Sequence, residues 1–430
     1  MTNEDIHTAE TIEHLLVEIW QQVLGVPIRV DDNFFQLGGN SMQAAMIMNR
    51  LQEKVRAVFH PAIIFDAPTI TLLVEYLRTH YAHLYGQDRQ RTSNGISCQL
   101  TAEEIVDARQ HFLEREASKE MAVDVNSPKN GPAIFILSPP RSGSTLLRVI
   151  LGGHSKIFSP PELYLWSFNT LKERRDKLSG RLSFFREGLI RAVMQLLGVS
   201  KEAAENTLQE CENGEMTVHA FFHSLQNWAH GRLIVDKTPG YALHPMVLQR
   251  LEAEFDGAFF IHLVRHPMAS IASFEDVRVD LVTRDERDPL PSSAKKRGEL
   301  WWLISHEHIL NFLRSVPNDR QIRIRYEDLV QDPQPVVQAV CDKLRIEFHP
   351  HMLEPYADKK NRMTDGVSDV SRMLGDQKFH FYDRIDASRS DDWRQKNIQD
   401  FLSDRSWAVA ETFGYTRAVS DEKEREQWEI

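Results

Sequence analysis

Apolar residues recur at helical spacing at the start of the chain. In residues 11–24 they fall at positions i, i+3, i+4, i+7 and i+8, which predicts an amphipathic helix. Further helices are predicted after Ser41, around the apolar cluster 63–65 and from Ile70 onward. The pattern therefore predicts a small all-α domain of four helices over residues 1–85.

The pattern changes after this domain. Residues 86–97 are polar, which predicts a solvated tether, and a helix with capping-box spacing opens at Thr101, so 86–130 is interpreted as linker and leading helix. Over residues 131–430, short β-rich runs alternate with helical stretches, which predicts an α/β domain with a largely parallel sheet. The predicted strands are residues 133–137, 233–236, 259–264 and 322–326.

Composition excludes several classes of protein. The 430 residues are 42% hydrophobic and 26% charged, without an apolar run long enough to span a bilayer, so no membrane segment is expected. The acidic start of the chain does not resemble a signal peptide, which predicts a cytoplasmic protein. The net charge of -11 argues against nucleic-acid binding. Cys98, Cys211 and Cys341 are widely separated, and neither a disulfide framework nor a metal site is expected.

Ser41 stands at the predicted start of a helix, where it is either a simple helix cap or an exposed site of modification. It ends the stretch DNFFQLGGNS (32–41), and FDAPTI (65–70) follows. This constellation resembles acyl and peptidyl carrier proteins of polyketide and non-ribosomal peptide assembly lines, over residues 10–82. The resemblance implies that a phosphopantetheinyl transferase attaches 4'-phosphopantetheine to Ser41 and that upstream synthase modules are partners. It leaves open whether the cargo is acyl or peptidyl.

A loop of small residues follows the first strand of the α/β domain. Residues 138–145 read SPPRSGST and lead into an apolar helix, an arrangement that directs backbone N–H groups at an anion. A nucleoside-triphosphate loop reads GxxxxGK(S/T), but here Ser144 stands in place of the lysine, while Arg141 supplies a cation earlier in the loop. The loop is therefore poorly equipped for ATP, and the remaining alternative is a plain strand-turn-helix corner.

A second anion-binding pattern lies at residues 259–267, where a strand runs into Arg265 and a helix is predicted from Pro267. Ser273, about two turns into that helix, could reach the same phosphate as Arg265. Two separate phosphate-binding elements indicate a nucleotide with phosphate at both ends.

From about residue 131 the chain resembles sulfotransferases that use 3'-phosphoadenosine-5'-phosphosulfate (PAPS), which implies a P-loop-like parallel-sheet fold. The resemblance assigns Arg265 and Ser273 to the 3'-phosphate, reads 325–329 as structural, and makes 371–375 a late nucleotide loop. The residues that it places around the 5'-phosphosulfate are Arg141, Ser142, Gly143, Ser144 and Thr145.

Sulfuryl transfer requires cations for the charge that develops and a base for the acceptor hydroxyl, and Arg141 is predicted as the first of these catalytic cations. Lys237, directly after a predicted strand, resembles the family's leaving-group lysine, but Thr238 follows it where cytosolic members have a histidine. Glu162 resembles the carboxylate base of other members, with a helix-start glutamate as the alternative. His223 is a second candidate for the base, and its HxxxH spacing with His219 is a weak metal signal, so no metal is predicted.

The combination predicts transfer of a sulfuryl group from PAPS to a hydroxyl, on resemblance a β-hydroxyl, of a carrier-tethered acyl chain. Residues 158–163 and 362–366 resemble sulfotransferases of olefin-forming polyketide assembly lines, in which sulfate becomes a leaving group. The thioesterase motif GxSxG is absent, so a separate thioesterase, a fragment or a retained sulfate are the alternatives. Rival hypotheses are a P-loop kinase acting on a carrier-bound substrate, and a carrier or docking subunit with a degenerate second domain.

Overall fold

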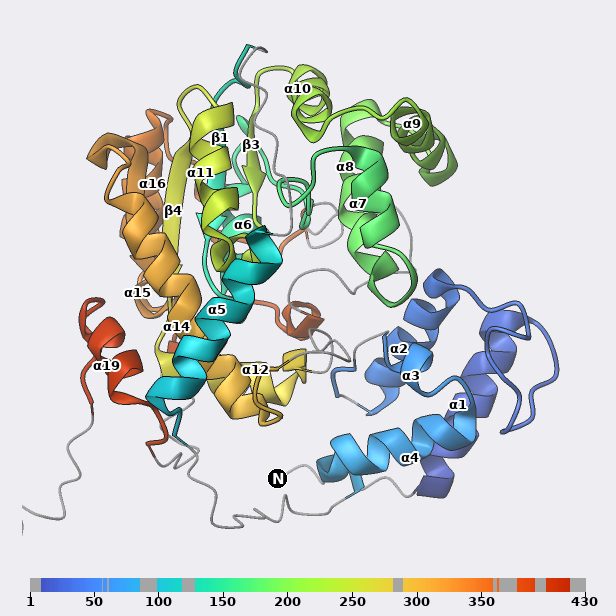
Figure 1. Ribbon diagram of the computed structural model, residues 1–430. Coiled ribbons are helices and arrows are strands. Elements are labelled where there is room, and N and C mark those ends of the chain that lie inside the picture. Colours follow the sequence, from blue (N-terminus) through green and yellow to red (C-terminus); the bar gives the residue numbers. More distant parts are fainter. Residues whose placement is uncertain are drawn as a thin grey trace, which may run out of the picture.

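In the computed structural model, a helical domain lies beside a larger α/β domain (Figure 1). The structure describes residues 9–55, 57–59, 62–85, 99–117, 128–280, 289–358, 362, 377–390 and 400–417. The predicted tether, the predicted nucleotide loop 371–375 and residues 363–366 lie outside the described residues.

The helical domain consists of α1 (Ala9–Leu24), α2 (Ser41–Val55), α3 (Ile63–Asp66), α4 (Ile70–His80) and the 3-10 turn η1 (Ala82–Tyr85). The apolar stripe of α1 is buried against the other helices, and Trp20 packs edge-on against Phe34 with ring centroids 5.3 Å apart. Thr69 caps α4 by accepting a hydrogen bond from the Leu72 N–H. The helices expected from the apolar spacing are thus present, and they share one core.

Asn40 caps α2, so the capping role considered for Ser41 belongs to its neighbour. The Asn40 side chain accepts a hydrogen bond from the Gln43 N–H at 3.0 Å, and the Gln43 side chain accepts one from the Asn40 N–H at 3.1 Å. This reciprocal pair is a capping box. Ser41 is therefore the first residue of the helix and not its cap.

The α/β domain contains a five-stranded parallel sheet in the order β2-β3-β1-β4-β5. The strands are β1 (Ala133–Leu137), β2 (Ile157–Phe158), β3 (Leu233–Asp236), β4 (Phe259–Val264) and β5 (Gln321–Arg325). The sheet is buried on both faces, because Phe135 and Leu137 pack in one core cluster while Ile134 and Ile136 pack in another. The last strand ends one residue earlier than expected, since Tyr326 already begins a helix.

Helices cover both faces of this sheet (Figure 1). Their bounds are α5 (Ala102–Ala117), α6 (Ser144–Leu151), α7 (Leu171–Lys177), α8 (Glu187–Leu197), α9 (Lys201–Asn213), α10 (Val218–Trp228), α11 (Pro245–Glu254), α12 (Pro267–Asp276), α14 (Ala294–Leu313), α15 (Tyr326–Gln331), α16 (Pro333–Leu344) and α19 (Asp404–Glu411). The 3-10 turns are η2 (Gly180–Arg186), η3 (Pro239–Leu243), η4 (Asn318–Arg320), η5 (Pro350–Leu353), η7 (Gln377–Phe381) and η8 (Ala387–Ser390).

Helix α5, predicted as a leading helix, packs on the α/β domain. Its capping box forms as expected, with the Glu104 N–H donating to the Thr101 hydroxyl and the Thr101 N–H to the Glu104 carboxylate. Lys296 of α14 pairs with Glu104 at 2.8 Å, and Arg109 pairs with Glu307 of α14 at 2.6 Å. These two ion pairs attach α5 to α14.

Candidate active site

The loop after β1 is shaped by two residues with positive φ. Gly143, at φ 88°, directly precedes α6 and offers no side-chain cap, so the first N–H groups of α6 face the loop. Arg141 has φ 68°. A Cβ atom on Gly143 would lie 2.2 Å from the Tyr326 ring, so this position requires glycine. The central strand therefore delivers a tight loop and a helix start to the carboxyl edge of the sheet.

Several buried donors around this loop have no partner in the part of the chain that the structure describes. The hydroxyls of Ser138 and Ser142 and the Nε atom of Arg265 are buried without a hydrogen-bond partner among the described residues. Leaving a buried donor unsatisfied costs about 1–3 kcal/mol, and more for a charged group. Three such donors beside a helix N-terminus fit an anionic ligand that accepts their hydrogen bonds.

The two predicted phosphate-binding elements meet. Arg265 lies at the end of β4, and Ser273 lies on α12, which begins at Pro267 as expected. Arg141 Nε donates a hydrogen bond to Ser273 Oγ at 3.1 Å, and Arg265 Nη1 donates one to the Arg141 carbonyl at 3.0 Å. The Arg265 guanidinium also stacks 4.4 Å from the centroid of the Tyr326 ring. Because β1 and β4 are neighbours in the sheet, their carboxyl ends bring both elements together.

The predicted phosphate-binding loop at residues 138–145 is called the phosphate loop below, and Lys237 joins it to Glu162. Lys237 follows β3, and its Nζ donates a hydrogen bond to the Glu162 carboxylate and lies 3.5 Å from Thr145 Oγ1. Both partners are buried, with Lys237 1% and Glu162 7% exposed. Separating the charges of a buried ion pair costs several kcal/mol. The two side chains therefore hold each other in place.

The segment that carries Glu162 is fixed from two sides. Arg148, buried on α6, donates to the Ser159 carbonyl at 2.6 Å, and Ser159 Oγ donates to the Arg148 carbonyl at 2.8 Å. On the other side, Gly188 of α8 packs directly on the backbone of Glu162, where a Cβ would lie 2.0 Å from the carbonyl oxygen. Burial and the neighbouring Glu162 carboxylate raise the pKa of Tyr164 far above its usual range, so this phenol stays protonated.

Asp236, directly before Lys237, anchors the residues that follow Glu162. It accepts hydrogen bonds from Thr238 Oγ1 at 2.9 Å and from the Tyr241 hydroxyl at 3.2 Å. The Tyr241 oxygen in turn accepts from the Leu165 N–H at 2.9 Å. Burial raises the pKa of Asp236 to about 7, although these hydrogen bonds oppose the rise.

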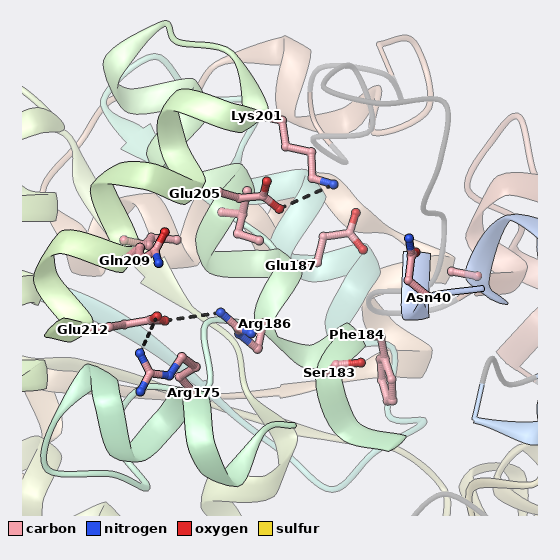
Figure 2. A pocket seen from close by; sticks show the side chains of 13 residues that line it. Asn40, Arg175, Ser183, Phe184, Arg186, Glu187, Lys201, Glu205, Gln209 and Glu212 are labelled. Atoms are coloured by element: carbon pink, nitrogen blue, oxygen red, sulfur yellow. Dashed lines mark hydrogen bonds and ion pairs between the residues drawn. The ribbon is translucent and has the colours of Figure 1, made fainter. Parts of the chain in front are cut away.

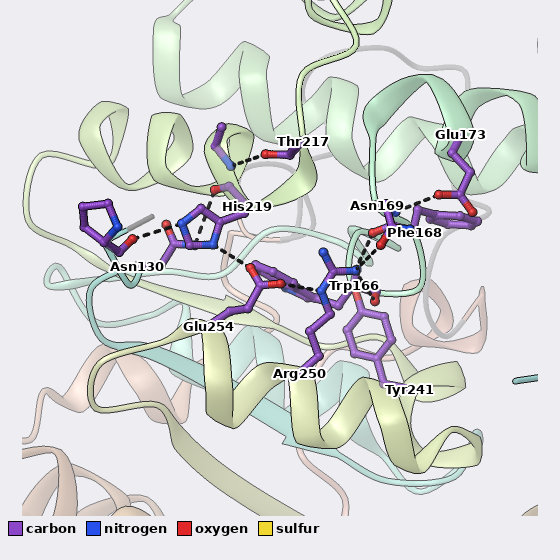
Figure 3. Close-up of polar contacts among 12 residues, drawn as sticks. Asn130, Trp166, Phe168, Asn169, Glu173, Thr217, His219, Tyr241, Arg250 and Glu254 are labelled. Atoms are coloured by element: carbon purple, nitrogen blue, oxygen red, sulfur yellow. Dashed lines mark hydrogen bonds and ion pairs between the residues drawn. The ribbon is translucent and has the colours of Figure 1, made fainter. Parts of the chain in front are cut away.

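A second buried network supports the same segment (Figure 3). Arg250 on α11 donates to the Phe168 carbonyl at 2.7 Å and to Glu254 at 2.6 Å, and Glu254 contacts His219 Nδ1 at 2.5 Å. His219 also contacts Asn130, which precedes β1, so this network lies at the amino ends of the strands. It is therefore a structural network on the edge of the sheet opposite the phosphate loop.

His223 lies on α10 with His219 and is exposed. Since α10 is anchored at the amino edge of the sheet, the structure does not bring His223 to Lys237 or Glu162. It does bring together the other proposed residues of the α/β domain. Those residues are Arg141, Ser142, Gly143, Ser144, Thr145, Glu162, Lys237, Arg265 and Ser273.

Sequence reasoning missed the residues that hold this site. The role of Arg148 could have been inferred from the sequence, because a cation inside the apolar run 146–151 needs a buried polar partner. The role of Asp236 could also have been inferred, because it is a carboxylate at the end of a predicted strand, directly before Lys237. The role of Gly188 had no signal in the sequence, since only packing brings α8 onto Glu162.

Within the described ranges, no group of histidine, cysteine or acidic side chains is arranged to hold a metal ion. None of the described helices combines the length and apolar character that a membrane crossing requires.

The N-terminal region matches carrier domains. A family model described as a phosphopantetheine attachment site matches residues 14–77. Tyrocidine synthase 2 of Brevibacillus parabrevis is 42% identical over 67 residues, which are 15% of this chain and 2% of that synthase. Surfactin synthase subunit 2 of Bacillus subtilis (strain 168) is 31% identical over 132 residues, 29% of this chain and 3% of that subunit. The chain thus spans a very small part of these curated relatives.

The α/β domain matches sulfotransferases. The model of the sulfotransferase family matches residues 132–350. The sulfotransferase domain of the Synechococcus PCC 7002 olefin synthase superposes with a TM-score of 0.61 at 36% identity, covering 70% of this chain and 100% of that domain. The sulfotransferase domain from the curacin biosynthetic pathway superposes with a TM-score of 0.62 at 39% identity, covering 67% and 99%. The chain therefore belongs to the sulfotransferase family and carries a phosphopantetheine carrier domain ahead of its sulfotransferase domain.

Proposed function

We propose that this enzyme transfers a sulfuryl group from PAPS to a β-hydroxyl of an acyl chain that 4'-phosphopantetheine tethers to Ser41. The observation that carries the proposal is the position of Lys237, between Thr145 of the phosphate loop and the buried Glu162. This arrangement joins an anion-binding loop, a cation and a carboxylate, which are the groups that sulfuryl transfer requires.

The donor is assigned to the loop and to the β4–α12 junction. Arg141, Ser142 and the first N–H groups of α6, at residues 143–145, would hold the 5'-phosphosulfate. Arg265 and Ser273 would hold the 3'-phosphate, and Arg265 Nε, for which the described residues offer no partner, fits that role. The contact between Arg141 and Ser273 makes both ends of one nucleotide reachable from adjacent side chains.

When PAPS is bound, its sulfur–oxygen bond to phosphate breaks as a new sulfur–oxygen bond to the acceptor oxygen forms. Glu162 would accept the proton of the acceptor hydroxyl, and Lys237 would neutralise the charge that develops on the departing phosphate oxygen. Their mutual hydrogen bond keeps both groups oriented before substrate arrives. Arg148 and Gly188 position the Glu162 backbone, so the carboxylate does not have to move far.

A kinase is disfavoured by the placement of the lysine. In a nucleoside-triphosphate loop the lysine lies within the loop, whereas here Ser144 occupies that position and Lys237 enters from β3. The rise in melting temperature on nucleotide binding distinguishes a sulfotransferase from a kinase. We expect 3'-phosphoadenosine-5'-phosphate to raise the melting temperature more than ATP with Mg²⁺, and the reverse order would favour the kinase.

The acceptor and the partners are proposed from the fused carrier and from the two similar sulfotransferase domains. The curated relatives of the carrier domain are peptide synthases, which supports upstream synthase modules and a phosphopantetheinyl transferase as partners. The similar domains come from an olefin synthase and the curacin pathway, which supports a β-hydroxyl acceptor whose sulfate serves as a leaving group. A separate thioesterase would then act on the sulfated product.

The decisive experiment follows the mass of the intact chain. Ser41 is loaded with a β-hydroxyacyl pantetheine arm, PAPS is added, and we expect a gain equal to one SO3 group. The same cargo without its hydroxyl and the Lys237→Ala variant are the controls, and neither should gain mass. Absence of the gain with every β-hydroxylated cargo tested would refute the proposed function.

A further inference from the structure

The carrier domain touches the sulfotransferase domain at two places (Figure 1). Its helix α2 packs against η2, next to the start of α8, and the end of its helix α4 packs against the residues that follow α12. We call these contacts the α2 contact and the α4 contact.

The α2 contact buries residues that belong to neither hydrophobic core. Ala45 is 4% exposed yet lies outside the core of the carrier domain, and Phe184 of η2 is 8% exposed yet lies outside the core of the sulfotransferase domain. Both line a cavity of about 430 Å³ between α2 and the helices α7 to α9 (Figure 2). Asn40, the residue directly before Ser41, also lines this cavity. The attachment end of α2 is therefore part of the interface.

The α4 contact is polar. Arg278 Nη1 donates to the carbonyl oxygen of His80, the last residue of α4, at 3.2 Å. Asp280 orients the arginine through a bidentate pair at 3.0 and 2.9 Å. Burial and the nearby Arg278 charge lower the pKa of His80, so its ring stays neutral beside the guanidinium. The helix end, with its partial negative charge, thus faces an oriented cation.

Each contact lies next to a segment that forms one wall of the proposed active site. The α2 contact lies on η2, and the cavity beside it reaches Glu187 and Ile190 at the start of α8, where Gly188 packs on the Glu162 backbone. The α4 contact lies just beyond α12, which carries Ser273. The carrier domain thus touches both the wall that holds the proposed base and the wall that holds the proposed 3'-phosphate site.

We propose that this docked arrangement is the productive one, in which the carrier domain delivers its arm to the sulfotransferase domain of the same chain through the α2 and α4 contacts. The inference rests on the proposed function and adds the surface that selects the partner. A small interface suffices, because both domains belong to one chain and their covalent linkage gives a high effective concentration. The same surface would favour this carrier domain over an unrelated one that lacks the matching residues.

The docking itself is tested without any turnover. Small-angle X-ray scattering of the full chain should give the compact profile of the docked domains. Ala45→Glu, which places a carboxylate in the cavity that Phe184 also lines, and Arg278→Ala should each increase the radius of gyration. Two matched controls change exposed residues, namely Gln21→Glu on α1 and Arg314→Ala directly after α14. Both should leave the radius of gyration unchanged. An extended wild-type profile, or equal profiles for all variants, would overturn the docking.

Delivery within one chain is tested by mixing. One full-length chain carries Ser41→Ala with an intact catalytic site, and the other carries the loaded arm with Lys237→Ala, so that transfer requires two chains. We expect single-turnover transfer in the mixture to be roughly a hundredfold slower than in the wild type at about ten micromolar protein, because linkage within one chain supplies effective concentrations of order millimolar. Wild-type rates should not depend on protein concentration.

Ala45→Glu and Arg278→Ala should lower the wild-type rate toward that of the mixture, while unchanged circular dichroism and melting temperature confirm that both variants fold. Equal rates for the mixture and the wild type would overturn delivery within one chain. If the wild type never transfers sulfate, the proposed function fails, whereas the scattering measurement still decides whether the carrier docks.

Discussion

Arg141 Nε donates a hydrogen bond to Ser273 Oγ at 3.1 Å, although the two residues are 132 positions apart in the chain. The first belongs to the loop after β1 and the second to α12 after β4. Their contact means that the two predicted anion-binding elements lie side by side. Had they faced different directions, a nucleotide phosphorylated at both ends would have no binding site between them.

Substitutions of these two residues should weaken nucleotide binding. Arg141→Ala removes a charge-assisted hydrogen bond of about 1.5–3 kcal/mol, so the Kd of 3'-phosphoadenosine-5'-phosphate should rise roughly tenfold to a hundredfold. Ser273→Ala removes a neutral donor, so its effect should be smaller, about fivefold. Isothermal titration calorimetry measures both values, with Arg314→Ala as the control. Unchanged affinity in Arg141→Ala would exclude this loop as the nucleotide site.

Substitutions of Lys237 and Glu162 should affect the stability of the fold and the rate of turnover differently. Either single substitution, Lys237→Met or Glu162→Gln, leaves a buried group without its charged partner and should destabilise the fold by about 3–5 kcal/mol. The double variant removes both charges, so it should be more stable than either single variant. All three should lose about a hundredfold or more in kcat. Urea unfolding and single-turnover mass spectrometry measure the two effects, and a double variant with wild-type turnover would contradict the assigned roles.

Gly143→Ala should damage the phosphate loop. An alanine there adopts a strained positive φ of 88° and places its Cβ 2.2 Å from the Tyr326 ring. The expected loss is about 3 kcal/mol or more in stability, together with weaker nucleotide binding. Gly198→Ala is the matched control, because its φ is 64° and no atom lies within 4 Å, so it should cost only about 1 kcal/mol. Similar losses for both variants would show that Tyr326 does not restrict the loop.

Gly188→Ala should lower kcat through the position of Glu162. Helix propensity alone favours alanine by about 1 kcal/mol, but the new Cβ would lie 2.0 Å from the Glu162 carbonyl oxygen. The Glu162 backbone must therefore shift, and kcat should fall while the Kd of the nucleotide stays the same. Gly240→Ala, which meets no atom within 4 Å, is the control and should retain activity. A fully active Gly188→Ala variant would show that Glu162 needs no such positioning.

Asp236 should make stability depend on pH. Burial raises its pKa to about 7 in the folded state, against about 3.9 in the unfolded chain. The folded state therefore retains the proton while the unfolded chain releases it, so the contribution of Asp236 is complete below about pH 4 and is lost as the pH rises to about 7. Asp236→Asn does not titrate, so its stability relative to the wild type should increase over this window, by about 4 kcal/mol at most. Urea unfolding at several pH values measures this difference, and a difference that does not change with pH would contradict the raised pKa.

The local pattern of apolar and polar residues was sufficient to predict many of the helices and strands. The periodicity of residues 11–24 predicts α1, and the β-branched and aromatic runs predict β1, β3 and β4, because each signal depends only on neighbouring residues. The one-residue error at β5 shows the limit of this approach, since strand and helix meet at Arg325 and Tyr326 without a break in composition. The helix cap at Asn40 was missed for a similar reason, as a serine and an asparagine cap equally well.

The sequence by itself determined the two domains and the residue types at the phosphate loop, because strand, loop and helix follow one another along the chain. Tertiary structure alone decided which of these residues meet. Parallel pairing sets the carboxyl ends of β2, β3, β1 and β4 side by side. The β2–β3 pair brings Lys237 to Glu162, and the β1–β4 pair brings Arg141 to Ser273. It also leaves His223 exposed on a helix that is anchored at the opposite edge. The physical reason is that sheet register and helix packing, which depend on contacts distant in sequence, determine where each side chain lies.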